Sequence, residues 1–274
     1  MGEKKVLDEL KAYLDSAKAA ARAGAKALTA YWGQRLHVEN KKRFDYVTDA
    51  DIASENAVLN EIRQRHPEHG ILSEETPADL AHAKAQQGPL WVVDPLDGTT
   101  NFIHGFPHVA VSVALLLQGR PAVGVVLDLT KGEEFAASRG GGAWLGSQRL
   151  KTAELPRERA LLLTGFPFRD KELLDPYLAL FKDIFTQCAG VRRAGTASLD
   201  LAYVAAGRGQ GFWELGLKPW DLAAGILLVE EAGGLVSDFQ GGDGALWSGN
   251  VVAAAKELHP WLRGQCAAHF GARR

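Results

Sequence analysis

Three apolar runs rich in β-branched residues follow one another between residues 90 and 129, and they read LWVVD, VAVSVALLL and AVGVVLDL. Apolar runs of this length, bounded by glycine, proline and charged residues, are typical of buried strands. None of them approaches the roughly 20 apolar residues that a membrane-spanning helix needs. The chain of 274 residues is 46% hydrophobic, which is enough for a sizeable core, in one large domain or in two closely packed halves.

The segments before these strands predict an α+β first half. Leucine and alanine recur at steps of three and four in residues 3–32, which predicts an amphipathic helix. A second helix is predicted over residues 49–66, with Thr48 as its N-cap. Residues 70–75 read GILSEE and predict a short strand that ends in two acids, whereas the polar residues 79–89 are predicted to form a surface loop.

The pattern changes after a charged, proline-containing segment at residues 149–159. Beyond it, short strand patterns alternate with longer helical ones, as in ALLLTG followed by LLDPYLALFKDIFTQ. This alternation is typical of an α/β layered arrangement. We therefore expect a single domain over residues 1–274, with an α+β half at about 1–150 and an α/β half at about 151–274.

Two aspartates stand at the end of the first apolar run, in the stretch WVVDPLDGTTN. Asp94 closes the strand pattern, and the proline after it cannot donate a ladder hydrogen bond, so the chain must turn there. Gly98 permits a close approach of the backbone to a ligand, and the N–H groups of Thr99 and Thr100 are suited to an anion. Because Asp94 and Asp97 would repel an anion, we expect a hard divalent cation between them. The alternative is a plain Asp–Gly turn without a ligand.

Four further acids have both a structural and a functional interpretation. Glu74 and Glu75 close the short strand predicted before the apolar runs. Asp221 stands at the start of a predicted helix, where Asp is a favoured N-cap that contributes about 1 kcal/mol. Asp51 lies three residues after Thr48, which is the acidic position of a capping box. Taken singly, each of these acids is more typical of a structural role.

Composition and charge argue against several classes of protein. The net charge of −2 does not favour direct binding to nucleic acid or to a membrane surface. The two cysteines, Cys188 and Cys266, are too few for a disulfide framework and are not spaced as the ligands of a zinc site are. The N-terminus reads MGEKKVLDEL and lacks the apolar region of a signal peptide, which predicts a cytoplasmic protein.

Taken together, the motifs resemble those of the inositol monophosphatase family. The stretch WVVDPLDGTTNFIHGFP is similar to the central signature of that family, and the Glu–Glu pair before it and PWDLAAGILLVEEAGG after it are similar to two others. The stretch DYVTDAD resembles a fourth, weaker signature of the family. The order and spacing agree over about residues 5–265, and the segment RRAGTASLDLAYVAAGRGQGFWELGLKPWD is especially similar to bacterial members.

The resemblance implies a role for each matching position. One Mg²⁺ would be held by Glu74, Asp94 and the backbone carbonyl of Leu96, a second by Asp94, Asp97 and Asp221, and a looser third would share Glu74. The attacking water would be activated by Thr99 together with Asp51. The phosphate would be bound by Gly98, Thr99 and Thr100, and the alcohol part of the substrate by Ala197 and Glu214, with Asp97 and Asp221 assisting.

The resemblance also implies a layered αβαβα sandwich, a homodimer and inhibition by lithium. The implied activity is Mg²⁺-dependent hydrolysis of inositol 1-phosphate or a similar small phosphorylated polyol, without a covalent phosphoenzyme. One alternative is the same chemistry on fructose 1,6-bisphosphate, 3'-phosphoadenosine 5'-phosphate, NADP or histidinol phosphate. Another is a non-catalytic role in a transcription or RNA-processing complex.

Three positions need separate mention. Ser73 stands where the family often has glycine, which leaves the ligand roles intact. A lysine that the family often has before the DxVT motif corresponds to Lys41 or Lys42. Arg192 and Arg193 are assigned to surface salt bridges by default, together with Arg208, and a place at the active site or at a subunit interface is the alternative.

Overall fold

The computed structural model describes residues 2–34, 36–42, 45–76, 79–167 and 170–271. The elements of the first half are α1 (Gly2–Thr29), β1 (Val38–Lys42), β2 (Asp45–Thr48), α2 (Asp49–Arg65), β3 (Gly70–Ser73), α3 (Leu80–Ala85), β4 (Leu90–Asp97), α4 (Thr99–Ile103), β5 (Ala110–Leu117), β6 (Arg120–Asp128), β7 (Glu133–Ser138), β8 (Gly142–Leu145) and β9 (Gln148–Arg149). Those of the second half are β10 (Leu161–Thr164), α5 (Leu174–Phe185), β11 (Gly190–Arg192), α6 (Ala197–Ala205), β12 (Gly211–Glu214), α7 (Pro219–Glu231), β13 (Leu235–Ser237), α8 (Ala245–Ser248), β14 (Val251–Ala254) and α9 (His259–Phe270), with 3₁₀ turns at Arg157–Arg159 and Lys171–Leu173.

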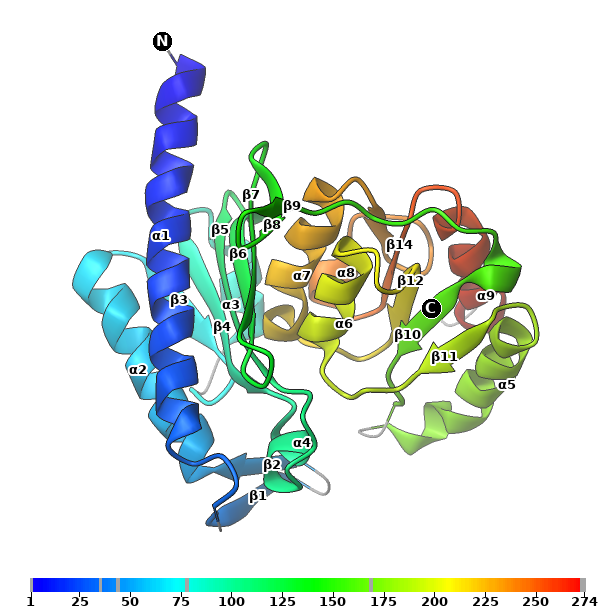
Figure 1. Cartoon of the computed structure of the whole chain (residues 1–274), viewed down its shortest axis with the longest axis horizontal. Helices are drawn as coiled ribbons and strands as arrows, with labels where there is room; N and C mark the ends of the chain where they lie inside the picture. The colour runs from blue at the N-terminus through cyan, green and yellow to red at the C-terminus, as the bar shows by residue number, and fades with distance from the viewer. Residues whose placement is uncertain (1, 35, 43–44, 77–78, 168–169, 272–274) are drawn as a thin grey trace.

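The elements form five layers (Figure 1). Helices α1 and α2 cover one face of a seven-stranded sheet, and α6 and α7 lie between this sheet and a five-stranded one. Helices α5 and α9 cover the outer face of the second sheet. Each layer buries an apolar face against the next, which is how layered folds build their core. The expected αβαβα sandwich is therefore confirmed.

The two sheets differ in their strand directions. The seven-stranded sheet has the order β3-β4-β5-β6-β7-β8-β9, in which only the β3–β4 pair is parallel. The five-stranded sheet has the order β11-β10-β12-β14-β13, in which β10 runs parallel to both of its neighbours and β14 antiparallel to both of its own. The second half is thus an α/β arrangement around a mixed sheet, with α6 and α7 on the inner face of that sheet.

The helices α6 and α7 pack unusually close to their neighbours. At Gly225 of α7, an added Cβ would lie 2.5 Å from a side-chain carbon of Leu201 in α6. At Gly124 of β6, an added Cβ would lie 2.8 Å from the Cα of Ala224. The absence of side chains at these two glycines lets the central layer lie against both the sheet and its partner helix.

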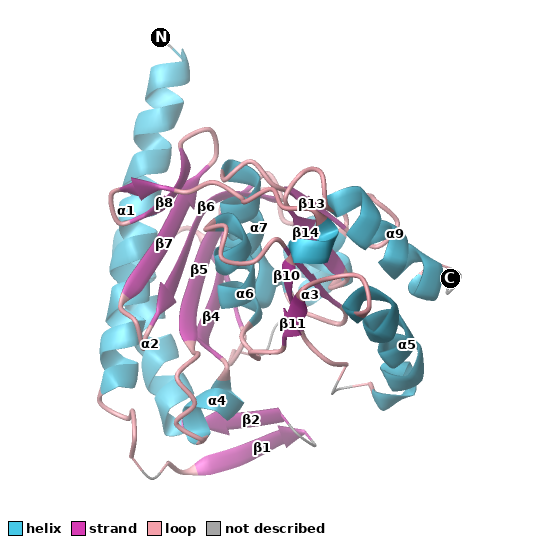
Figure 2. Cartoon of the chain, turned by 45° about the vertical axis from the view of Figure 1, so that its right-hand side comes forward, coloured by secondary structure: helices cyan, strands magenta, loops and turns pink. Residues whose placement is uncertain are grey.

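Most predicted elements are confirmed, and a few predictions are wrong. The surface loop predicted at residues 79–89 contains the short helix α3, whose N-cap Asp79 accepts hydrogen bonds of 3.0 Å from the N–H groups of Ala81 and His82. The hairpin of β1 and β2 was not predicted; it lies beside α4 at one end of the large sheet (Figure 2). Asp221 is the third residue of α7 rather than its N-cap, which is Lys218.

Candidate metal centre and cavity

Asp94 and Asp97 lie at the end of β4, where the strand is interrupted by a β-bulge. Asp94 pairs with Ser112 of β5 and Asp97 with Ala110, so β4 contains one more residue than β5 over this interval. Residues three apart in a regular strand point to opposite faces of the sheet. The extra residue resets this alternation, and both carboxylates line the same cavity.

The two carboxylates are also fixed by backbone N–H groups. Leu96 N–H donates a hydrogen bond of 3.1 Å to Oδ1 of Asp94, and Ser198 N–H donates one of 2.8 Å to Oδ2 of Asp97. Ser198 belongs to α6, so the second bond ties the end of the large sheet to the central helical layer. Each aspartate therefore presents its other oxygen from a defined position.

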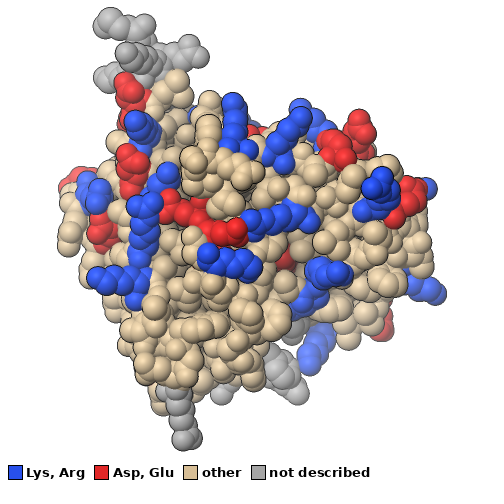
Figure 3. All heavy atoms as spheres, in the orientation of Figure 1, with Lys and Arg blue, Asp and Glu red and all other residues tan. Residues whose placement is uncertain are grey.

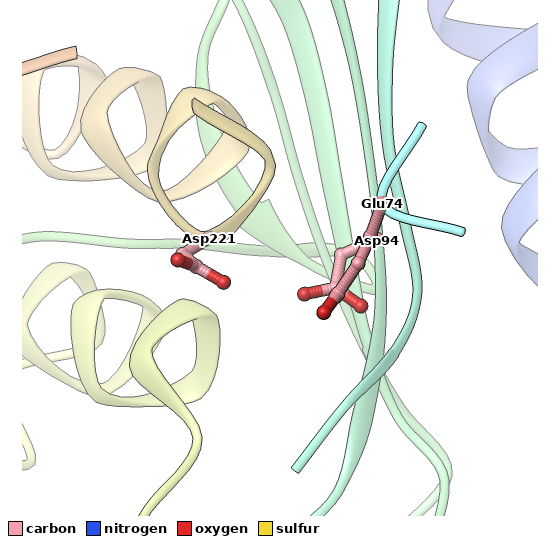
Figure 4. A group of neighbouring side chains, drawn as sticks. All are labelled: Glu74, Asp94 and Asp221. Carbon is pink, nitrogen blue, oxygen red and sulfur yellow. The ribbon is translucent and has the colours of Figure 1, made fainter. Parts of the chain in front are cut away.

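Glu74 and Asp221 bring their carboxylates to Asp94 from two other elements (Figure 4). Glu74 directly follows β3, which is parallel to β4, so Glu74 and Asp94 leave the sheet at the same edge. Asp221 faces them from the first turn of α7, where its Oδ2 accepts a hydrogen bond of 2.6 Å from the N–H of Lys218. One carboxylate oxygen of each of the three residues lies within 4.8 Å of the others.

The burial and mutual repulsion of these carboxylates favour the binding of a cation between them. Burial raises the pKa of Asp94 well above its usual value, and the nearby carboxylates raise it further, Glu74 most of all. Burial likewise raises the pKa of Asp97 to about 6, although its hydrogen bonds with Ser198 act in the opposite direction. Buried carboxylates in mutual repulsion are stabilised by a metal ion, and an all-oxygen donor set fits Mg²⁺. The residues present thus suit the expected metal.

Thr99 and Asp51 form a hydrogen-bonded pair beside the metal cluster. The Thr99 hydroxyl lies 3.0 Å from Oδ1 of Asp51 and 3.2 Å from the carbonyl oxygen of Leu96, to either of which it can donate. Oδ2 of Asp51 accepts hydrogen bonds from the N–H of Thr48 at 2.8 Å and from the Thr48 hydroxyl at 2.5 Å. The predicted capping box of α2 is therefore present, and Asp51 serves it with one oxygen while it holds Thr99 with the other.

The residues predicted to bind phosphate form part of the same wall. Gly98 has a φ of +96°, which is strained for any residue with a side chain, and an added Cβ would lie 2.5 Å from the Thr196 hydroxyl. Thr99 and Thr100 follow it in the first turn of α4. All three residues line the cavity that the carboxylates line.

This cavity has a volume of about 440 Å³. Its walls come from both halves of the chain and consist of Tyr46, Glu74, Asp94, Leu96, Asp97, Gly98, Thr99, Thr100, Asn101, Lys171, Arg193, Gly195 and Asp221. Sequence reasoning missed Tyr46, Asn101, Lys171 and Gly195 as wall residues. Of these, Asn101 could have been predicted, because it stands inside the central motif WVVDPLDGTTNFIHGFP. Its side-chain amide donates hydrogen bonds to the carbonyl oxygens of His108 and Ala194, at 2.8 and 2.9 Å.

Three of the predicted site residues lie apart from the wall of the cavity, in the part of the chain that the structure describes. Asp51 lies behind Thr99. Ala197 is buried at the start of α6. Glu214 is buried at the end of β12 and lines a separate small cavity of about 50 Å³. Burial raises the pKa of Glu214 well above its usual value, and the charge of Asp200 raises it further. Contact of Ala197 and Glu214 with a substrate stays a prediction.

The remaining sequence assignments have mixed outcomes. Arg208 forms a double hydrogen bond with Glu133, as a salt bridge requires. Arg193 was assigned to a surface salt bridge, and this was wrong: it lines the cavity and makes no ion pair among the described residues. The side chains of Lys41 and Lys42 lie outside the described residues. None of the described helices combines the length and the apolar character that crossing a bilayer requires.

The fold and the buried carboxylate cluster define a protein of the sugar-phosphatase type, and comparison with known proteins gives the family. The sequence model of the Inositol monophosphatase family matches residues 9–269. The chain is 52% identical to the Nus factor SuhB of Pseudomonas aeruginosa over 221 residues, which cover 80% of this chain and 81% of the relative. The chain belongs to the inositol monophosphatase family.

Solved structures agree with this assignment. The extragenic suppressor protein suhB from Bartonella henselae superposes with a TM-score of 0.87 at 38% identity, over 93% of this chain and 98% of that one. An inositol monophosphatase from Anabaena superposes with a TM-score of 0.85 at 36% identity, over 97% of this chain and 100% of that one. Family membership supports a phosphatase that acts on a small phosphate ester and is metal-dependent.

Proposed function

We propose that the protein is a Mg²⁺-dependent phosphomonoesterase that hydrolyses inositol 1-phosphate and similar small polyol phosphates. The observation that carries the proposal is the convergence of Glu74, Asp94 and Asp221 on one point of a cavity, next to the hydrogen-bonded pair of Thr99 and Asp51. Clustered carboxylates beside a glycine turn suit a phosphate ester only when a divalent cation lies between them.

The metal ligands are proposed to be Glu74, Asp94, Asp97, Asp221 and the carbonyl oxygen of Leu96, holding two or three Mg²⁺ ions. When bound, these ions supply charge neutralisation for the phosphate and the leaving oxygen, and they lower the pKa of water. Leu96 lines the same cavity as the carboxylates, and its carbonyl oxygen lies 3.2 Å from the hydroxyl of Thr99, which also lines it.

Thr99 and Asp51 are proposed to orient the attacking water and to take its proton. Asp51 is 1% exposed, and its Oδ1 lies 3.0 Å from the Thr99 hydroxyl, through which we propose that it acts. If Thr99 donates to Asp51, the lone pairs of its hydroxyl oxygen are left to accept a hydrogen bond from water. Gly98, Thr99 and Thr100 are proposed to bind the phosphate, and Ala197 and Glu214, with Asp97 and Asp221, to surround the alcohol.

Direct attack by water requires no protein nucleophile and therefore no phosphoenzyme. Phosphoprotein trapped by acid quench during turnover would contradict this part of the proposal. A homodimer and inhibition by lithium, both typical of the family, are proposed with it. Full activity at lithium concentrations comparable with that of Mg²⁺ would argue against a site of this type.

The substrate type is tested with a panel of esters at saturating Mg²⁺. Inorganic phosphate release is compared for inositol 1-phosphate, fructose 1,6-bisphosphate, 3'-phosphoadenosine 5'-phosphate, NADP and histidinol phosphate. The proposal predicts that inositol 1-phosphate is hydrolysed with a kcat/KM at least comparable with that of any other ester. A strong preference for fructose 1,6-bisphosphate, for a nucleotide or for histidinol phosphate would retain the metal chemistry and overturn the substrate type.

A role in a transcription complex is the second candidate, and a specific observation favours it: the relative from Pseudomonas aeruginosa carries the name Nus factor. The net charge of this chain is −2, and basic and acidic side chains lie side by side on the face shown in Figure 3. Such a surface favours a protein partner over direct binding to RNA. Recovery of RNA polymerase subunits with the tagged protein would support this role, whereas their absence under conditions that retain other partners would argue against it.

A further inference from the structure

One face of α2 carries three buried polar side chains. Asp51, Ser54 and Glu55 are 1%, 0% and 7% exposed, and their spacing of three and four residues places them on the same side of the helix. Each makes a hydrogen bond to a different segment of the candidate metal centre. The bond of Asp51 to Thr99 belongs to the proposed mechanism, whereas the other two reach the segments that carry the proposed metal ligands.

Ser54 is bonded to the bulge of β4. Its hydroxyl donates a hydrogen bond of 2.7 Å to the carbonyl oxygen of Pro95, which stands between the proposed ligands Asp94 and Leu96. On its other side Ser54 packs against α1, where a Cβ at Gly24 would lie 2.8 Å from Oγ of Ser54. The hydroxyl therefore has little room to rotate. Because the Pro95 carbonyl is held toward α2, the peptide units on either side of it are fixed in orientation.

Glu55 is bonded to the chain just after Glu74. Oε1 of Glu55 accepts hydrogen bonds from the N–H and the hydroxyl of Thr76, at 3.1 and 3.2 Å. The N–H of Glu74 itself donates a hydrogen bond of 3.2 Å to the carbonyl oxygen of Val93 in β4. Glu74 is therefore fixed by β4 at its own amide and by α2 two residues further along.

Anchors of this kind matter most for a small cation. Mg²⁺ requires nearly octahedral geometry with ligand distances of roughly 2.0–2.1 Å, whereas Ca²⁺ accepts flexible arrangements at roughly 2.3–2.6 Å. Groups that orient the ligands of a metal commonly contribute roughly 10- to 100-fold to its affinity. Glu74, Asp94 and Asp221 come from three different elements, so their spacing depends on contacts that hold these elements in place.

We infer that Ser54 and Glu55 are positioning residues that hold Asp94, Leu96 and Glu74 at the spacing that Mg²⁺ requires, and that they thereby set the preference of the site for Mg²⁺ over Ca²⁺. The inference rests on the proposed function, because it takes these residues to be metal ligands. Both side chains are buried, so they act through the segments that they hold. A purely structural role would lower stability and leave the relative affinities for the two ions unchanged.

The test is calorimetric titration of Mg²⁺ and of Ca²⁺ into the purified, chelator-treated protein. The quantity compared is the ratio of the two dissociation constants. Ser54→Ala and Glu55→Ala are each expected to weaken Mg²⁺ binding about tenfold and Ca²⁺ binding about twofold or less. Glu55→Gln is expected to keep the wild-type ratio, because one amide oxygen can accept both hydrogen bonds from Thr76.

Two matched controls lie on the same pair of helices. Ser16→Ala removes a buried hydroxyl of α1 that donates a hydrogen bond of 3.1 Å to the carbonyl oxygen of Ala12. Glu61→Ala removes a carboxylate of α2 that pairs with Arg65. Both variants are expected to leave the two dissociation constants unchanged. A loss of Mg²⁺ affinity in Ser16→Ala equal to that in Ser54→Ala would overturn the inference.

Folding of each variant is checked by circular dichroism. If an alanine variant does not fold, Thr76→Val replaces it, since Thr76 is exposed and its hydroxyl is one of the two donors to Glu55. This variant is expected to weaken Mg²⁺ binding about threefold, as the loss of one hydrogen bond implies. Unchanged Mg²⁺ binding in Thr76→Val would then overturn the inference for Glu55.

The outcomes separate this inference from the proposed function. If the wild type binds Mg²⁺ and hydrolyses inositol 1-phosphate, but Ser54→Ala and Glu55→Ala keep the wild-type ratio, the proposed function stands and the inference fails. Equal weakening of both ions in Glu55→Ala and Glu55→Gln would also overturn it, because Glu55 would then act through its charge. A wild-type protein that binds neither ion would overturn the proposed function together with the inference.

Discussion

The Thr99 hydroxyl lies 3.0 Å from Oδ1 of Asp51, although the two residues are 48 positions apart in the sequence. The other oxygen of Asp51 accepts the N–H of Thr48 at 2.8 Å. The start of α2 thereby fixes the orientation of a threonine that follows the end of β4, in the first turn of α4. A local device for beginning a helix has become part of the candidate active site.

Asp51→Asn is expected to lower kcat about 10²-fold or more, because positioned acid–base groups contribute 10²–10⁴-fold. An amide has only one acceptor oxygen, so it cannot hold Thr99 and complete the capping box at the same time. Phosphate release under saturating substrate measures the effect. Asp49→Asn is the matched control, since Asp49 is exposed in the same helical turn and is expected to keep full activity. A fully active Asp51→Asn enzyme would remove Asp51 from the mechanism.

Asp221→Asn is expected to keep the fold and to lose most activity and Mg²⁺ affinity. The amide oxygen can still accept the hydrogen bond from Lys218 N–H, whereas the negative charge shared with Glu74 and Asp94 is lost. Circular dichroism reports the fold and calorimetric titration the affinity for Mg²⁺. Asp243→Asn, at a side chain that is 94% exposed, serves as the control. An unfolded Asp221→Asn protein would show instead that the helix start dominates.

Two glycine-to-alanine substitutions are expected to change stability in opposite directions. Gly124→Ala places a Cβ 2.8 Å from the Cα of Ala224, and overpacking of this kind costs about 1–3 kcal/mol. Gly264 lies exposed in α9 with nothing near the position of a new Cβ, so alanine there is expected to add about 0.5–1 kcal/mol. Denaturant unfolding measures both. Equal effects at the two sites would contradict the close packing of α7 on the large sheet.

Stability is expected to fall as the pH drops below about 6.5, in part because of two histidines. Nε1–H of Trp91 donates a hydrogen bond of 3.1 Å to Nδ1 of His69, and the ring of His66 stacks on that of His69 at 4.8 Å. Burial lowers the pKa of both imidazoles from 6.5. As the pH falls through 6.5, the unfolded chain therefore takes up protons that the folded chain does not, and stability is lost until the lowered folded pKa values are passed.

This pH dependence is measured as the midpoint of thermal unfolding between pH 8 and pH 5. The His69→Gln variant is expected to show a shallower decline than the wild type. The control is His82→Gln, at an exposed position in α3, which should decline as the wild type does. Parallel curves for all three proteins would show that the histidine pair does not govern the response to acid.

The larger elements were predictable from sequence because their patterns are long and regular. Helices α1 and α2, the three central strands and the later strand–helix alternation all follow from periodicity and capping residues. Short elements were not predictable. Helix α3 has only six residues, LAHAKA, and its small and polar side chains do not form an apolar stripe of helical period. The β1–β2 hairpin was missed because β1 reads VENKK, with a single apolar residue, and the strand-forming residues of β2 (DYVT) are too few to give a pattern.

The sequence predicted which carboxylates belong to the site, but it did not predict how they are arranged in space. Asp94 and Asp97 stand three apart, and only the bulge between them, invisible in the sequence, puts them on one side of β4. Arg193 was assigned to the surface because nothing in its local sequence shows that the loop after β11 returns to the end of β4. Such long-range placement depends on tertiary packing, which single-sequence patterns do not contain.

The most direct test of the account is inorganic phosphate release from inositol 1-phosphate by the purified protein with Mg²⁺, after excess chelator, and after Mg²⁺ is restored. The account predicts steady release that stops with chelation and returns with Mg²⁺, and that is nearly absent in the Asp221→Asn variant. Release that persists in excess chelator, or that is undiminished in Asp221→Asn, would contradict the assignment of the carboxylate cluster as the metal centre of a phosphatase.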